Sequence, residues 1–130
     1  MPVDQSLVGR EFPPTPPYRV SAEKVRELAT ATGSRENPIP ATFPIVMAFE
    51  AMNAFLADVG VELHRIVHGE QRFAYERPIR VGDELTASLR VASLRQIGGN
   101  DIIGTRSEIR DAAGDLVCTT TATLVHRGDA

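Results

Sequence analysis

The sequence predicts an α+β fold in which an antiparallel sheet of about five strands wraps around one long apolar helix. The first observation is the stretch from Pro44 to Val59, which has helical spacing and is apolar on almost every side. The second is that strand patterns follow one another from Leu63 to the end. A helix that is apolar nearly all round needs burial nearly all round. A curved sheet on one side and a partner subunit on the other would provide it.

The first 17 residues predict an extended arm that leads into a short strand. Prolines fix the backbone there in extended or turn conformations and exclude a helix; they are Pro13, Pro14, Pro16 and Pro17. A short strand is expected around Tyr18 to Val20. With 130 residues, of which 42% are hydrophobic, the chain is long enough for one domain with a core and too short for two. Residues 1–130 are therefore expected to form a single domain, with 1–17 as its proline-rich arm.

Two helices are expected before the strands. Ser21 is a good N-cap for a short amphipathic helix, and Gly33 is a natural stop for it. Thr42 is the candidate N-cap of the apolar helix, with Pro44 at the first helical position. This second helix is expected to end near Gly60.

Strands alternate with well-marked turns in the second half of the chain. The predicted strands are 63–77, 84–97, 102–110 and 116–126, the first of them broken near Gly69. The predicted turns between them are Val81-Gly82-Asp83, Gly98-Gly99-Asn100-Asp101 and Asp111-Ala112-Ala113-Gly114-Asp115. Short connections between long neighbouring strands predict an antiparallel meander.

Composition excludes several classes of function. The net charge of −3 and the absence of a Lys/Arg run argue against a nucleic-acid partner. The longest apolar segment is too short to span a bilayer, and no secretory signal is present, so we expect no membrane partner. A single cysteine, Cys118, suits a reducing compartment and a cytoplasmic protein. None of the three histidines has metal-ligand spacing, so neither a metal nor another cofactor is expected.

Short motifs, in order and spacing, resemble one enzyme superfamily. They are Thr32-Gly33, Asn37-Pro38, Pro40-Ala41-Thr42-Phe43-Pro44, Arg77-Pro78-Ile79-Arg80-Val81-Gly82-Asp83 and Gly114-Asp115-Leu116-Val117. Together they resemble the MaoC-like (R)-specific enoyl-thioester hydratases and dehydratases, and the 40–44 run resembles their N-terminal, substrate-binding domains. The resemblance implies a hot-dog fold, which is the sheet wrapped around a helix described above. It also implies substrates that are acyl thioesters of coenzyme A or acyl carrier protein.

The chain departs from this family where catalysis would take place. By the resemblance, an Asp and a His in this loop position a water and move a proton, which is general acid-base work. Ser34 or Arg35 stands where the Asp is expected, and Pro40 where the His is expected. Alternatively, the part containing the His is deleted between Pro38 and Ile39. In either alignment no catalytic residue of the dyad is present.

Binding residues are predicted around the start of the apolar helix. Free backbone N–H groups there can donate to a thioester carbonyl, and Thr42 and Phe43 would lie nearest. The simpler alternative is that Thr42 only caps the helix and Phe43 only fills the core. Asn37 is a turn residue that becomes a substrate-binding residue only through the resemblance. Phe49 belongs to the apolar face and could line an acyl channel.

Three other polar residues have competing interpretations. Glu50 is the only acid in the middle of the apolar helix, where hot-dog thioesterases place a catalytic acid; it could equally form an ion pair or reach solvent. His68 is interpreted first as a histidine at a strand edge with an ordinary hydrogen bond. Asp83 is interpreted first as a turn residue.

The leading functional hypothesis is a non-catalytic, acyl-binding subunit of a hydratase or dehydratase, whose partner supplies the Asp and the His. The alternatives are a thioesterase that uses Glu50, and a homodimeric acyl-binding or scaffold protein without chemistry. All three need a second hot-dog subunit, identical or different. One sheet covers only one side of an apolar helix and leaves sheet edges open.

Overall fold

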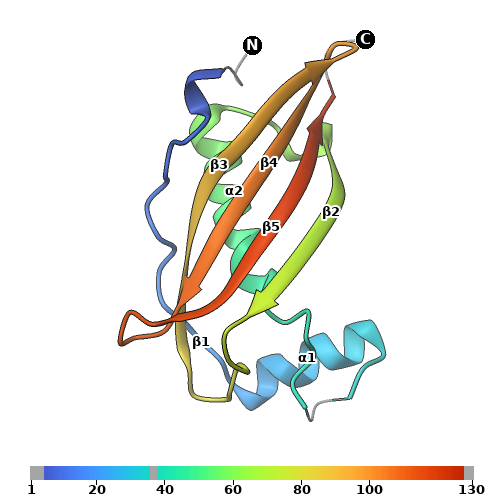
Figure 1. Cartoon of the computed structure of the whole chain (residues 1–130). Coiled ribbons are helices and arrows are strands. Elements are labelled where there is room, and N and C mark those ends of the chain that lie inside the picture. Colours follow the sequence, from blue (N-terminus) through green and yellow to red (C-terminus); the bar gives the residue numbers. More distant parts are fainter. Residues whose placement is uncertain (1–4, 36–37, 128–130) are drawn as a thin grey trace.

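The computed structural model describes residues 5–35 and 38–127, and in it one curled antiparallel sheet wraps around a helix (Figure 1). The strands lie in the order β1-β3-β4-β5-β2. Helix α2 runs along the inside of the sheet, and α1 lies beyond one end of it. The predicted fold class is confirmed. The elements are β1 (Tyr18–Arg19), α1 (Ala22–Thr32), α2 (Ile45–Val59), β2 (Ile66–Tyr75), β3 (Glu84–Ile97), β4 (Asn100–Arg110) and β5 (Leu116–His126), with 3₁₀ turns at Gln5–Leu7 and Leu63–Arg65.

Helix α1 begins and ends as predicted. The Ser21 hydroxyl accepts a hydrogen bond from the Lys24 N–H at 3.2 Å, which satisfies one of the free amides of the first turn. Gly33 ends the helix with φ at +69°, a left-handed conformation that glycine adopts without strain.

The start of α2 differs from the prediction. Pro44 is the N-cap, and Thr42 makes no capping hydrogen bond. The chain reaches the helix through tight turns, in which the Phe43 N–H donates to the Pro40 carbonyl at 2.9 Å and the Ile45 N–H to the Thr42 carbonyl at 3.0 Å. These i→i+3 bonds use backbone groups instead of a side-chain cap.

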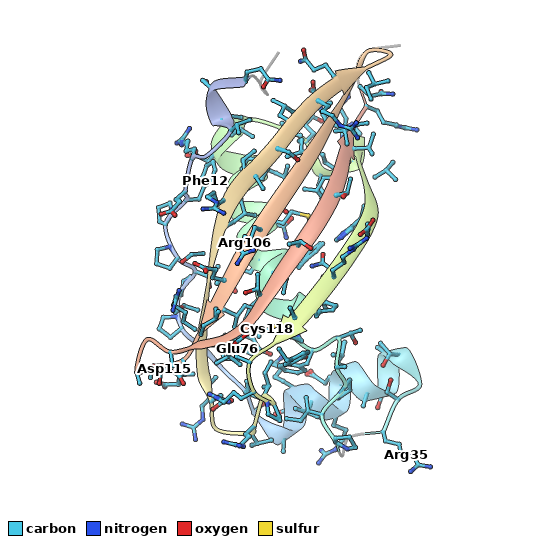
Figure 2. The ribbon with its side chains drawn as sticks, in the orientation of Figure 1. Phe12, Arg35, Glu76, Arg106, Asp115 and Cys118 are labelled. Carbon is cyan, nitrogen blue, oxygen red and sulfur yellow. The ribbon has the colours of Figure 1, made fainter. Side chains whose placement is uncertain are left out.

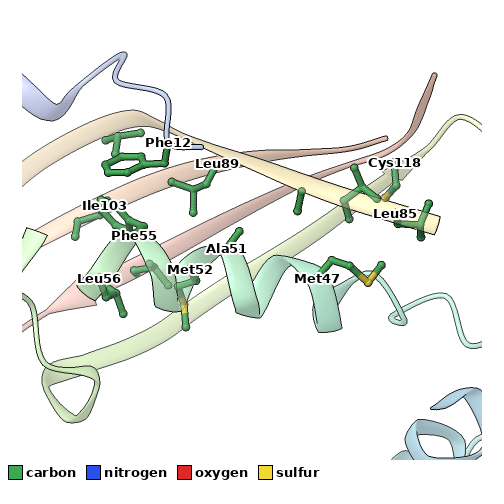
Figure 3. Close-up of a cluster of buried hydrophobic side chains, with 14 of the residues drawn as sticks. Phe12, Met47, Ala51, Met52, Phe55, Leu56, Leu85, Leu89, Ile103 and Cys118 are labelled. Atoms are coloured by element: carbon green, nitrogen blue, oxygen red, sulfur yellow. The ribbon is translucent and has the colours of Figure 1, made fainter. Parts of the chain in front are cut away.

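The core lies between α2 and the inner face of the sheet (Figure 3). Helix residues Met47 and Phe55 are fully buried. Alternate residues of the strands face them, as a period of two requires; on β3 and β4 the buried apolar ones are Leu85, Ala87, Leu89, Val91, Leu94, Ile103 and Ile109. The opposite side of α2 is exposed in the single chain, and Phe49, which also lines a cavity between the helix and the sheet, is itself 43% exposed. The helix is therefore covered on one side only.

The proline-rich arm covers the edge of β3. The Phe12 and Thr15 N–H groups donate to the carbonyls of Leu89 and Ala87 at 2.9 and 3.0 Å. The Phe12 ring packs edge-on against Phe55, with ring centroids 5.0 Å apart. Because proline has no N–H to donate, prolines fit between these bonded positions without cost to the pairing. The arm and β1 close this edge, while the other edge of the sheet, β2, stays open.

Strand connectivity corrects the predicted meander. Strands β3, β4 and β5 are joined as expected, but β2 pairs with β5 at the far edge and not with β3. Two boundaries also shift. The turn between β3 and β4 is only Gly98-Gly99, both with positive φ as a tight hairpin requires. The segment from Leu63 starts as a 3₁₀ turn, and the predicted break near Gly69 is a register shift between His68 and Glu70.

Candidate functional site

A groove of about 910 Å³ opens beside the loop that leads into α2. One wall is formed by residues 38–41 of that loop, and the other by residues 75–81, which follow β2. Its surface is mainly apolar, from Pro38, Ile39, Pro40, Ala41, Tyr75, Pro78, Ile79 and Val81. Polar side chains come from Glu76, Arg77 and Arg80. Pro40, which stands where the sequence predicts the missing His, is part of this lining, whereas Ser34 and Arg35 are not.

The loop wall is fixed by two anchors. The Tyr75 hydroxyl donates a hydrogen bond to the Ala41 carbonyl and so joins the end of β2 to the loop. Phe43 is completely buried and packs edge-on against Tyr18, with centroids 6.3 Å apart. Buried aromatic packing of this kind holds the backbone that precedes α2 in one position.

The opposite wall is braced by an arginine and two aspartates. The Arg77 guanidinium donates to both Asp83 carboxylate oxygens, at 2.9 and 3.2 Å, and to Asp111 at 3.2 Å. Desolvation raises the Asp83 pKa, but hydrogen bonds from Arg77 and from the Arg80 N–H outweigh it, so that the pKa is lowered. Asp83 is therefore a structural turn residue. The Arg-Pro…Gly-Asp motif shapes the groove by bidentate pairing.

Two weakly acidic groups near the groove stay protonated at neutral pH. Burial raises the pKa of Tyr75 to about 12, so its hydroxyl is a donor. Burial also raises the pKa of Cys118, which pairs with Tyr75 across β5 and β2, to about 11. A thiol in this state is a poor nucleophile. Glu76 is the only carboxylic acid among the described residues that line the groove, and no histidine is among them.

The residues at the predicted dyad positions do not form an acid-base pair. Ser34 and Arg35 are exposed, and Figure 2 shows Arg35 beyond the end of α1, away from the sheet. The Ser34 hydroxyl lies 2.8 Å from that of Thr32. Pro40 lines the groove and accepts the Phe43 N–H. Asn37 lies outside the described residues.

The other predicted site residues fall in different places. The Thr42 side chain is exposed, and the Phe43 amide is already bonded within its turn. Glu50 is exposed on α2 and does not line the groove, whereas Phe49 lines a second, smaller cavity inside the sheet. His68 lies beside Gln71 in that cavity, with its Nε2 atom 2.9 Å from the Gln71 Oε1 atom. Roles of these residues in binding stay predictions.

Sequence reasoning did not identify Tyr75 or the cavity under α2. The alternation of side chains along the strands could have indicated both. Tyr75 follows Phe73 by two positions and so faces inward with it, and period-two patterns place Thr105, Ser107 and Thr120 on the inner face. Across the described part of the chain, no three His, Cys, Asp or Glu side chains are grouped so that they could hold a metal ion. Within the same residues no helix is long and apolar enough to cross a membrane.

The comparison with known families decides where the chain belongs. The family described as FAS1-like, dehydratase domain region, matches residues 26–120. The chain belongs to this FAS1-like dehydratase family. It is 40% identical to a UPF0336 protein of Streptomyces avermitilis, over 98% of this chain and 97% of the other. It is 41% identical to a UPF0336 protein of Leifsonia xyli, over 99% of both.

Solved structures place this FAS1-like dehydratase family member among the MaoC-like hot-dog proteins. The HadBC (3R-hydroxyacyl-ACP dehydratase) complex of Mycobacterium tuberculosis has a chain that is 26% identical, with a TM-score of 0.82 over 96% of this chain and 99% of that one. A MaoC-like dehydratase is 28% identical, with a TM-score of 0.79 over 95% of this chain and 43% of that one. The (R)-hydratase of A. caviae, at 22% identity and a TM-score of 0.68, shares the fold over 93% of this chain and 98% of its own.

Proposed function

We propose that this chain is the acyl-thioester-binding subunit of a hydratase or dehydratase acting on (R)-3-hydroxyacyl or enoyl thioesters, and that a second hot-dog subunit supplies the catalytic Asp and His. The observation that carries the proposal is the groove at the start of α2. Its lining is mainly apolar, and its walls are held by the Tyr75 hydrogen bond and by the pairing of Arg77 with Asp83 and Asp111. No Asp or His is among its described lining residues. A site of this kind suits binding of an acyl thioester better than water activation.

Charge at the groove suits the phosphorylated carrier of a thioester. Arg80 lines the groove and is exposed, while Arg77 is occupied by Asp83 and Asp111. Both coenzyme A and acyl carrier protein present a phosphopantetheine arm, whose phosphate a guanidinium can bind. Arg80 is the residue we expect to contact that phosphate, whereas Arg77 keeps the wall in shape.

The open edge of the sheet suits the partner subunit. Strand β2 has unpaired backbone groups along its outer side, while the arm and β1 close the opposite edge. Beside β2, the uncovered side of α2 exposes Phe49 at 43%, and Val67 on β2 is exposed at 48%. A second hot-dog subunit, homologous or identical, would bury these groups. It would also bring its own loop next to the groove.

The decisive experiment compares hydration of crotonyl-CoA by the purified chain alone and by the chain coexpressed with a hot-dog subunit that carries an intact Asp and His loop. We expect no enzymatic rate from the chain alone and a substantial rate from the pair. Arg80→Ala in the pair should raise KM with little change in kcat, because it removes binding that ground state and transition state share. The same assay with crotonyl-acyl carrier protein identifies the carrier. Enzymatic hydration by the isolated chain would disprove the division of labour.

The thioesterase alternative has less support, because Glu50 lies outside the groove lining. Release of free thiol from acyl-CoA, abolished by Glu50→Gln, would restore that alternative. A chain that binds acyl-CoA as a homodimer and gains no activity with any dyad-bearing subunit would instead favour the scaffold protein.

A further inference from the structure

A small polar cavity lies inside the fold, between α2 and the inner face of the sheet. Its roof is the apolar face of the helix, formed by Ile45, Ala48, Phe49 and Met52. Its floor contains three buried hydroxyl residues, which are Thr105 at 5%, Ser107 at 3% and Thr120 at 2% exposure. His68 and Gln71 of β2 close the side toward the open edge of the sheet.

The strand registers bring these polar groups together. Ser107 of β4 lies directly opposite Thr120 of β5, and Thr105 lies two positions along β4, so all three face the same way. Gln71 pairs with Ala122, which in turn pairs with Thr105. Four polar side chains from three strands thus meet at one place on a face that is otherwise apolar.

One amide group in this cavity has an unsatisfied atom. The Gln71 Nε2 atom is buried and has no hydrogen-bond partner, while the Gln71 Oε1 atom lies 2.9 Å from the His68 Nε2 atom. Exchanging the two ends of the amide would pair the nitrogen with His68 and leave the oxygen without a partner. In either orientation one buried amide atom of this lining residue has no partner. Buried polar atoms without a partner are costly, so such an atom points to a group that the cavity receives.

The free volume fits one polar group. About 10 Å³ is available to the centre of a water molecule, which is about what a single water requires when it has several polar neighbours. A hydroxyl or carbonyl oxygen of a ligand has a similar size. An oxygen atom that projects from an acyl chain lying between Phe49 and His68 would therefore fill this space.

Resting on the proposed acyl-thioester function, we propose that this cavity is a subsite for an oxygen atom on the acyl chain, so that the subunit favours acyl chains with a hydroxyl or carbonyl group over fully hydrocarbon ones. Gln71 binds the oxygen, and the hydroxyls of Thr105, Ser107 and Thr120 complete its hydrogen bonds. His68 holds the Gln71 amide in place. The roof residues Phe49 and Met52 cover the neighbouring carbon atoms.

The position of the cavity along α2 indicates which part of the acyl chain would lie in it. Its roof residues run from Ile45, one position after the N-cap Pro44, to Met52, eight positions after it. At the helical rise the roof spans about 1.5 to 12 Å from the start of the helix. With a thioester carbonyl at the start of α2, the subsite would extend from the reacting carbons to atoms further along the acyl chain, and the Met52 end would receive an oxygen beyond carbon 3.

The test measures binding of CoA esters by isothermal titration calorimetry. The protein is the chain in the complex in which it purifies, or the chain alone if it purifies alone. Decanoyl-CoA is compared with hydroxydecanoyl-CoA isomers whose hydroxyl lies beyond carbon 3, because the 3-hydroxy isomer is the substrate that the proposed function already assigns. At least one isomer should bind about fivefold or more tightly than decanoyl-CoA, as expected for one well-formed buried hydrogen bond. Equal affinity for all esters would overturn the subsite.

Variants separate the subsite from the general binding of thioesters. Gln71→Met and Thr120→Val keep side-chain size and remove the polar atoms, and each should abolish the preference while decanoyl-CoA still binds. Thr121→Val is the matched control, because the next residue of β5 faces the other side of the sheet and should leave the preference intact. Preference that survives Gln71→Met and Thr120→Val would overturn the assignment. Failure of every ester to bind would instead overturn the proposed function, and with it this subsite.

Discussion

His126 and Asp101 form a buried polar pair on the inner face of the sheet. They lie opposite each other at the end of β5 and the start of β4, and they are 3% and 1% exposed. The His126 Nδ1 atom is 3.0 Å from one Asp101 carboxylate oxygen, and the Gln96 amide donates to the other at 2.9 Å. Both carboxylate oxygens are thus satisfied. The pair is far from the groove and fixes the end of the sheet.

Replacing the histidine should strongly destabilise the fold. His126→Leu fills the space but leaves the Asp101 carboxylate buried with only Gln96, which should lower the free energy of unfolding by about 3 to 5 kcal/mol. Urea denaturation measures this directly. The control is His64→Leu, because the His64 side chain is 72% exposed beside Glu62 and its loss should change stability by less than about 0.5 kcal/mol. Equal losses of stability in the two variants would mean that the buried pair contributes no more to the free energy of unfolding than the exposed His64.

At the level of elements, the strand and helix patterns predicted most of the fold. Helix α1 with its Ser21 cap, the span of β3 and the span of β5 agree with the sequence, because each depends on local spacing and local caps. The helix cap and the strand spans require only information from neighbouring residues. The motifs of the resemblance lie in the two walls of the groove, in the loop before α2 and after β2, but the groove itself needs the contact between these distant segments.

What local patterns could not predict depends on contacts between distant segments. Strand β2 pairs with β5 because the sheet curls around α2 and the connection crosses to the opposite side, which no turn signal between residues 76 and 83 shows. The arm pairs with β3 through Phe12 and Thr15, although its prolines predicted only extended chain. The polar cavity likewise needs the register between three strands before Gln71 and Thr120 can be placed together.

Arg77 connects two elements and makes their stability depend on pH. It joins Asp83, at the start of β3, to Asp111, in the turn before β5. The pKa of Asp111 is lowered, first by the hydrogen bond from the Asp115 N–H and further by Arg77. Since the pKa values of Asp83 and Asp111 are both depressed below 3.8 in the folded state, their contribution is fully present above that pH. It is lost as the pH falls through the folded pKa values.

Asp83→Asn should therefore reduce stability at pH 7 and matter less in acid. We expect a loss of about 1 to 2 kcal/mol at pH 7, because a charge-assisted hydrogen bond is replaced by a neutral one. The difference from the wild type should shrink as the pH falls below about 4, because the aspartate becomes protonated first in the unfolded state and then, at the lower pH of its depressed pKa, in the folded state. Urea denaturation across this pH range is the measurement. Asp115→Asn, in the same turn as Asp111, serves as the control, and a difference that stays constant in acid would contradict the assignment.

For the whole molecule, the two edges of the sheet have opposite properties. The arm and β1 cover β3, with Phe12 packed against Phe55. No described segment covers β2 in the single chain, and Val67 on that strand is 48% exposed. Exposed edges that carry apolar side chains favour association with another strand. These properties favour the β2 edge as the place for the proposed partner, next to the cavity under α2 and the uncovered face of that helix.

A lysine at this edge should prevent association without unfolding the chain. Val67→Lys places a charge on the open edge strand, a feature that disfavours pairing with another strand, so the dissociation constant should rise by about tenfold or more. Ile97→Lys is the matched control, because Ile97 is 53% exposed but lies at the β3–β4 hairpin, away from the β2 edge. Size-exclusion chromatography with light scattering, at several concentrations, measures both variants, and circular dichroism checks that both are folded. If Ile97→Lys dissociated the assembly and Val67→Lys did not, the partner would bind at the hairpin and leave the β2 edge free.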